Sequence, residues 1–147
     1  MNKDLEIIKQ LRTNSRYPLI QISKKTGIPL STVFDRIKHN EKNIIARYTS
    51  LVDFNKLGFG IRVFTMIQTT KAEQMCNYFQ RHNSINSMFR INGQYNIFID
   101  AVFSAMSEYL NFVSEMNQFE IQGKTENFVL ETIHNENFLT GKGDENG

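Results

Sequence analysis

The chain has 147 residues, of which 40% are hydrophobic, enough for one medium-sized domain or two small ones with packed cores. The formal net charge is only +2, but residues 1–60 hold 11 Lys and Arg against 5 Asp and Glu, and residues 61–147 hold 6 against 10. A basic part joined to an acidic part is typical of a nucleic-acid reader that carries a second module, although chance clustering of charges gives the same counts. No run reaches the ~20 apolar residues of a membrane span, and the N-terminus has no apolar stretch typical of a signal peptide.

The first part of the chain predicts three helices. Asp4 is suited to cap a helix that runs to about Thr13. Residues 19–42 then predict two short helices joined by a tight turn, because Gly27 readily adopts the left-handed conformation that ends a helix and Pro29 suits a first helical position. This arrangement indicates a helix-turn-helix.

The second helix of this pair has two faces. Its apolar positions recur at helical spacing and predict one buried face: Leu30, Val33, Phe34 and Ile37. At about 100° per residue, the other side carries hydroxyl, carboxylate, imidazole and ammonium groups: Ser31, Thr32, Asp35, Lys38, His39 and Lys42. We interpret this helix as one that enters the major groove of DNA; an ordinary helical hairpin with a solvated face is the alternative.

The expected DNA contacts divide into two classes. Phosphate contacts are expected from Arg16, Lys38, Lys42 and Arg47, the last on an extended stretch that flanks DNA as a wing does. Base contacts are expected from Ser31, Thr32, Asp35 and His39. Asp35 would accept a hydrogen bond from a cytosine amino group or orient Arg36, and a solvated role is its alternative. Arg36 lies between the two faces, where it would pair with Asp35 or Glu41, or reach a phosphate.

The second part of the chain alternates strand and helix patterns in the order β-α-β-β-α-β. Strands are expected over residues 61–69, 85–91, 95–103 and 125–133, and helices over 71–81 and 107–116. The first strand is apolar on both faces, which predicts burial on both sides. Asn92-Gly93 predicts a tight hairpin turn. In the last helix, Leu110 and Val113 are expected to point inward.

No constellation for catalysis is visible. His39, His82 and His134 lack metal-ligand spacing, and Cys76 lies on a predicted core stripe. The chain has no glycine-rich loop of the kind that cradles phosphates. We therefore expect a protein that is not an enzyme and needs no cofactor or metal. As the only cysteine, Cys76 excludes an intramolecular disulfide and favours a reducing, cytoplasmic location.

Several positions together resemble the Lrp/AsnC (leucine-responsive) family of transcription regulators, over roughly residues 2–135. They are Ile22, Gly27, Val33, Arg36 and Ile37 in the helix-turn-helix, then Ile45, Tyr48 and Asp53, the junction pair Leu57-Gly58, and the hairpin GQYN at 93–96. The resemblance implies an α+β fold with a winged helix-turn-helix over 1–53 and a junction at 54–60. It also implies a βαββαβ ferredoxin-like (RAM-type) domain for dimerisation and effector sensing over 61–135. Residues 136–147 are polar and glycine-rich, and we expect a disordered tail there.

The resemblance further implies a function: binding of double-stranded promoter DNA by a homodimer that assembles further into a tetramer or octamer. It places a small-molecule effector, often an amino acid, near Gly93, Tyr95 and Asn96. Asn96 stands where the family carries an aspartate, and a neutral amide cannot form an ion pair with an amino acid's ammonium group. Turn and strand roles are the alternative for these three residues. The alternative functions are a broad-specificity DNA-organising protein and a small-molecule sensor that acts through protein partners.

Overall fold

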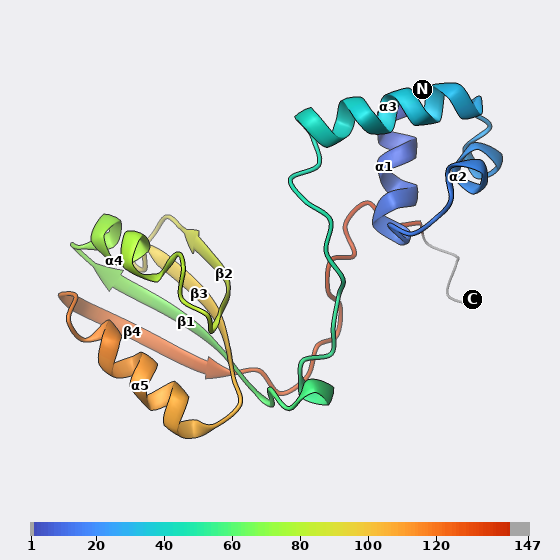
Figure 1. Ribbon diagram of the computed structural model, residues 1–147. Helices are drawn as coiled ribbons and strands as arrows, with labels where there is room; N and C mark the ends of the chain where they lie inside the picture. The colour runs from blue at the N-terminus through green and yellow to red at the C-terminus, as the bar shows by residue number, and fades with distance from the viewer. Residues whose placement is uncertain (1, 142–147) are drawn as a thin grey trace. The chain divides into compact units, whose positions relative to one another are not determined.

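The computed structural model describes residues 2–141, which divide into two compact units (Figure 1). The helix-turn-helix unit contains the residues up to Leu51 and a second, C-terminal segment that begins at Ile133. The sheet unit spans Val52–Thr132. The chain therefore passes between the units twice, and the α+β fold predicted from the sequence is confirmed.

The helix-turn-helix unit is built from α1 (Lys3–Thr13), α2 (Leu19–Thr26) and α3 (Leu30–Asn43). Asn2, and not Asp4, caps α1, since its side chain accepts hydrogen bonds from the backbone N–H groups of Asp4 and Leu5 at 3.0 and 3.3 Å. The core is formed by buried aliphatic side chains of all three helices and the turn: Ile7, Ile22, Ile28, Val33 and Ile37.

The C-terminal segment was expected to be disordered from residue 136, and this is wrong for residues 136–141. The guanidinium of Arg12 on α1 donates to the carbonyl oxygens of Phe138 and Glu136, at 2.6 and 3.0 Å. The backbone N–H of Gly141 donates to the Thr13 hydroxyl at 2.7 Å. Composition alone missed these contacts because the donors and acceptors lie at opposite ends of the chain. Residues 142–147 lie outside the described residues.

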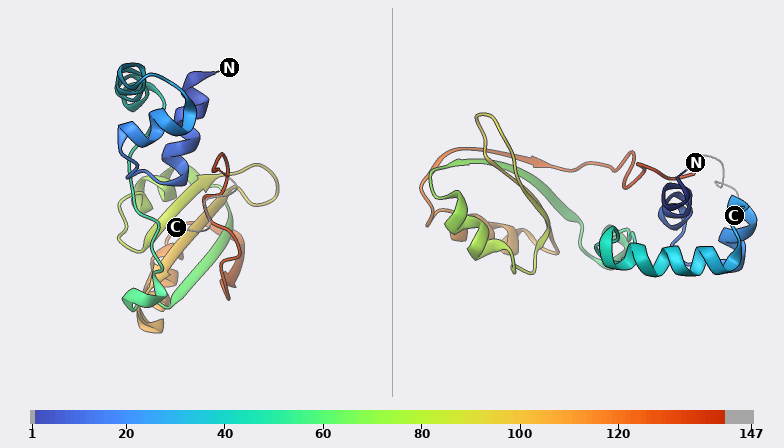
Figure 2. Two further views of the ribbon diagram at one scale, coloured as in Figure 1. Left: turned by 90° about the vertical axis from the view of Figure 1, so that its right-hand side faces the viewer. Right: turned by 90° about the horizontal axis from the view of Figure 1, so that it is seen from above.

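The sheet unit begins with a short 3-10 helix, η1 (Asn55–Leu57), and continues in the predicted order. Its elements are β1 (Ile61–Thr69), α4 (Ala72–Phe79), β2 (Ile85–Arg90), β3 (Ile97–Phe103), α5 (Met106–Met116) and β4 (Ile121–Phe128). The strands pair antiparallel in the order β2-β3-β1-β4. Figure 2 shows α4 and α5 on the same side of the sheet. The core between sheet and helices contains, among others, Val63, Ile67, Ile99, Phe79 and Phe112.

The last strand and the last helix of this unit differ from the sequence interpretation. The strand runs over Ile121–Phe128, so it starts four residues and ends five residues earlier than expected, and Gly123 lies inside it opposite Gln68. A Cβ atom at Gly123 would lie 3.1 Å from the Gln68 side chain and 3.7 Å from the Tyr95 ring, so this glycine permits a close approach and does not break the strand. Leu110 of α5 is exposed, and Tyr109, Phe112 and Met116 take the inward positions.

The predicted burial of β1 on both faces is wrong for this chain by itself. Residues at alternate positions from Val63 to Thr69 are buried under the helices, and those between them are half-exposed. The side away from the helices, here called the open face, carries large apolar side chains in contact: the Phe98 ring centroid lies 5.3 Å from that of Phe64 and 6.2 Å from that of Phe89. Met66, paired with Phe98, lies beside them.

Candidate nucleic-acid interface

The turn between α2 and α3 holds the two helices at a defined crossing. Gly27 ends α2 with φ 71°, the left-handed conformation predicted for it, and its N–H donates to the carbonyl oxygen of Ser23. The Ser23 hydroxyl in turn donates to the Ile28 carbonyl at 2.6 Å, which joins α2 to the residue that precedes Pro29. These local contacts, together with buried Ile28, orient the start of α3.

The faces of α3 are divided nearly as expected. Val33, Ile37 and Asn40 form its buried side. Residues on the far side are exposed: Ser31, Asp35, Lys38, His39 and Lys42. Thr32 and Arg36 are half-buried. Five of the predicted contact residues on α3 are therefore brought to one accessible surface.

Arg36 has a structural partner that the sequence interpretation missed. Its Nε donates to Asp4 Oδ1 at 2.7 Å, and its Nη2 pairs with Asp4 Oδ2, so the guanidinium joins α3 to α1. This hydrogen bonding is the largest cause that lowers the pKa of Asp4, and it raises the pKa of Arg36. The expected pairing with Asp35 or Glu41 is wrong, because α1 crosses that flank of α3 and places a carboxylate there.

Arg16 and Arg47 lie outside α3, and both are exposed. Residues 44–54, expected to be extended, are neither helical nor paired as a strand within the described chain. The Tyr48 hydroxyl donates to Glu41 Oε1 at 3.1 Å, which links this segment to α3 next to Arg47. Burial and this carboxylate raise the pKa of Tyr48. Arg47 thus follows directly from the exposed end of α3.

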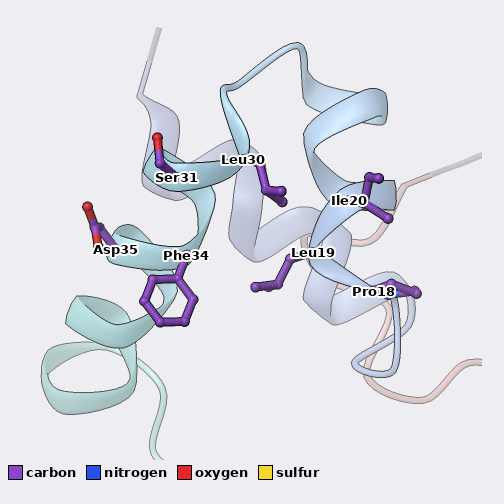
Figure 3. A pocket seen from close by; sticks show the side chains of 7 residues that line it. All are labelled: Pro18, Leu19, Ile20, Leu30, Ser31, Phe34 and Asp35. Atoms are coloured by element: carbon purple, nitrogen blue, oxygen red, sulfur yellow. The ribbon is translucent and has the colours of Figure 1, made fainter.

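Leu30 and Phe34 differ from the prediction: 47% and 44% of their surfaces are exposed, so they do not belong to the core. Phe34 follows Val33 by about 100°, which moves its ring to the flank of α3. There the two side chains line an open groove of about 570 Å³ with Pro18, Leu19 and Ile20, and with Ser31 and Asp35 (Figure 3). Helical spacing alone does not reveal this, because Leu30 lies within about 20° of buried Ile37 around the helix.

Asn40 is fully buried in the helix-turn-helix core. Its amide lies near enough to Asp4 to contribute to the lowered pKa of that carboxyl. Neither its Nδ2 nor its Oδ1 makes a well-formed hydrogen bond to any described residue. The core at the end of α3 therefore contains an unsatisfied polar group, which costs stability.

The hairpin residues proposed for an effector have structural contacts of their own. Gly93 adopts φ 107°, which the turn requires, and the Tyr95 ring lies over Gly123. The Asn96 amide accepts from the Thr69 N–H at 3.1 Å and donates to the Thr69 carbonyl at 2.8 Å. Both polar atoms of the Asn96 side chain are thus used inside the sheet unit.

Residues 2–141 contain neither a metal-binding group nor a membrane-spanning helix. No group of three or more His, Cys, Asp or Glu side chains is placed to hold a metal ion in this part of the chain. Within the same residues, no helix is long and apolar enough to span a bilayer. The surface of α3 and its surroundings is the strongest candidate site.

Comparison with known proteins agrees with this geometry. Residues 2–39 match a protein family described as winged helix-turn-helix DNA-binding. The HTH-type transcriptional regulator FL11 of Pyrococcus furiosus is 26% identical over 136 residues, covering 90% of both chains. An AsnC family transcriptional regulator from Agrobacterium tumefaciens has the same fold, with a TM-score of 0.79, 22% identity, and 92% and 94% of the two chains covered. A transcriptional regulator from Neisseria meningitidis, solved in complex with L-Met, superposes with a TM-score of 0.80 at 21% identity, covering 92% and 93%.

Proposed function

We propose that the chain is a DNA-binding transcription regulator of the Lrp/AsnC family, and that it binds promoter DNA with α3 in the major groove. The main support for DNA binding is one exposed side of α3, opposite its buried residues. This side carries Ser31, Asp35, Lys38, His39 and Lys42. Residues 1–60 also carry 11 Lys and Arg against 5 Asp and Glu, which suits a polyanionic duplex.

Roles follow from the chemistry of each side chain. The cations Arg16, Lys38, Lys42 and Arg47 bind phosphates, and Ser31, Thr32, Asp35 and His39 meet base edges. Arg36 is better placed to hold α3 on α1 through Asp4 than to contact a phosphate. DNA is bound where the chromosome is, so the location follows as cytoplasmic, and regulation of transcription needs no enzymatic activity.

The same proposal includes a homodimer formed through the open face of the sheet. Phe64, Met66, Phe89 and Phe98 gather there, no helix among residues 2–141 covers them, and Phe89 is 56% exposed. The nearby Arg62 guanidinium is held by Asp100 at 2.8 and 2.7 Å, so a partner subunit covers a charge that is already paired. Assembly of dimers into tetramers or octamers is part of the same family-based proposal.

An effector is proposed at the hairpin of residues 91–96. The complex of the structurally similar Neisseria regulator with L-Met supports an amino-acid effector. Its place at the hairpin rests on the family resemblance, and Gly93 is exposed there next to the half-buried Tyr95. Because Asn96 is hydrogen-bonded to Thr69, its role there is to hold the hairpin in place, and it lacks the charge that would pair with an ammonium group.

DNA binding is tested by titrating a fragment from upstream of the protein's own gene at several salt concentrations. Each neutralised phosphate contributes roughly −0.9 to the slope of log K against log salt, so replacing both Lys38 and Lys42 with alanine should reduce its magnitude by about 2. The matched control is the double replacement Arg81→Ala with Arg90→Ala, exposed cations of the sheet unit. A salt-independent midpoint contradicts the proposal, and equal affinity for random fragments favours a DNA-organising protein.

A further inference from the structure

The groove beside α3 is lined by large apolar side chains that lie outside the core and are exposed to water. Ile20 at the start of α2 is 55% exposed, and Leu30 and Phe34 are nearly half exposed. Figure 3 shows Leu19 and Leu30 extending toward the space between the two helices, with the Phe34 ring at its edge. Neighbouring large apolar side chains left open to water mark a binding surface more often than a packing defect.

This groove is continuous with the polar side of α3. Ser31 and Asp35, two of the proposed base-reading residues, line it together with Phe34. The ammonium of Lys38 lies 4.4 Å from the centroid of the Phe34 ring. Whatever enters the groove therefore meets apolar carbon, a hydroxyl and a carboxylate at once, with a cation at the rim.

Charge and chemistry together select the occupant. The Lys38 ammonium at the rim attracts an anion, while the residues that line the groove include no cation and one carboxylate, so the anionic groups of the ligand must stay outside it. Duplex DNA has this distribution: phosphates lie on the two rims of the major groove, and its floor presents the thymine 5-methyl group and the cytosine amino group. The methyl group is the apolar feature of that floor, and the amino group is a donor suited to Asp35.

We propose that Leu30, Phe34 and Ile20 contact the 5-methyl groups of thymine in the operator, beside a cytosine whose amino group donates to Asp35. The inference rests on the proposed DNA-binding function and specifies which bases α3 reads. Sequence preference then depends on apolar contact as well as on hydrogen bonds, and Phe34 and Leu30 are specificity-determining residues.

Uracil is the sharpest probe, because it keeps the hydrogen-bonding groups of thymine and lacks only the methyl group. A duplex is first selected by the wild-type protein from a random-sequence library and then synthesised with deoxyuridine in place of thymidine. Each buried methyl group should contribute about fourfold to affinity, so the wild type should bind the thymine duplex at least about fourfold more tightly.

The variants Phe34→Ala and Leu30→Ala should lower this thymine-to-uracil ratio toward one while the salt dependence of binding stays unchanged. Both side chains are substantially exposed, so the fold should persist, as thermal unfolding followed by circular dichroism would verify. Ile44→Ala, at the other end of α3 and 56% exposed, is the matched control and should keep the wild-type ratio.

Three results separate the possibilities. Equal binding of the two duplexes by the wild type, or an unchanged ratio in both variants, overturns the thymine inference and leaves DNA binding intact. Failure to select any duplex refutes the proposed function itself. A fall in apparent mass by light scattering in Phe34→Ala or Leu30→Ala, with equal binding of the two duplexes, would identify the groove as a protein interface and also overturns the inference.

Discussion

The side chain of Asn96 pairs with the backbone of Thr69 in both directions, as one peptide group pairs with another in a sheet. Its oxygen accepts from the Thr69 N–H at 3.1 Å, and its nitrogen donates to the Thr69 carbonyl at 2.8 Å. The pairing of β1 with β3 ends at Ile97, the first residue of β3, and the Asn96 amide extends it to Thr69 of β1. An aspartate at this position keeps the first bond and loses the second, because an ionised carboxylate has no proton to donate.

Replacing Asn96 with aspartate should lower the free energy of unfolding by about 1–3 kcal/mol at neutral pH, since the Thr69 carbonyl would then face a carboxylate. Protonation of the introduced carboxyl restores a donor, so the loss should shrink as the pH falls below its raised pKa. Urea unfolding at pH 7 and at pH 4 measures both effects. Asn92→Asp, in the exposed turn, is the control and should change little; an equal loss at the two pH values would contradict this account.

The pair between Asp4 and Arg36 should make the helix-turn-helix unit sensitive to acid. The pKa of Asp4 is lowered in the folded state, so the pair stabilises the protein above the pKa of the unfolded carboxyl and loses its contribution as pH falls through the lowered value. Asp4→Ala should therefore reduce the thermal midpoint at pH 7, and the difference from wild type should vanish in acid.

Glu6→Ala is the comparison for this experiment, because the Glu6 side chain forms a surface pair with Lys9 on the same helix. A midpoint difference for Asp4→Ala that persists below the lowered pKa would show that packing, and not charge, is responsible.

Asn40→Leu should stabilise the helix-turn-helix unit by about 1–2 kcal/mol. The substitution replaces a fully buried amide without well-formed hydrogen bonds by an apolar side chain of similar size. Thermal unfolding measures the gain, and Asn43→Leu, exposed on the same helix, is the control. A loss of stability together with a raised Asp4 pKa, measured by NMR titration, would mean that the proximity of the Asn40 amide to Asp4 outweighs the cost of burying that amide.

Phe98→Glu should convert the proposed dimer into a monomer at micromolar concentration, because a carboxylate placed between Phe64 and Phe89 would be buried without a partner. Light scattering gives the mass, and circular dichroism checks the fold. Leu110→Glu is the matched control, since Leu110 is 58% exposed on α5, on the opposite side of the sheet. A dimer that survives in Phe98→Glu, with the fold intact, would place the subunit contact elsewhere.

The order of elements was predictable because each element has a local signal in the sequence. The strand from Ile61 to Thr69, the left-handed Gly27 and the alternation of Ile97, Ile99, Ala101 and Phe103 all follow from local periodicity and backbone preference. For the same reason the exposed polar side of α3 was visible in the sequence: a helix with one apolar side must turn the other outward.

Contacts between distant segments were decided by the tertiary structure alone. Arg36 pairs with Asp4 because α1 crosses α3 there, and Arg12 holds residues 136–138 because the chain returns to α1 after Thr132. Nor did helical spacing decide that Phe34 would stay in the open, since that depends on where α2 packs and which flank of α3 it leaves uncovered. Periodicity determines which side chains share a face of a helix; only the packing of the other elements determines which faces are covered.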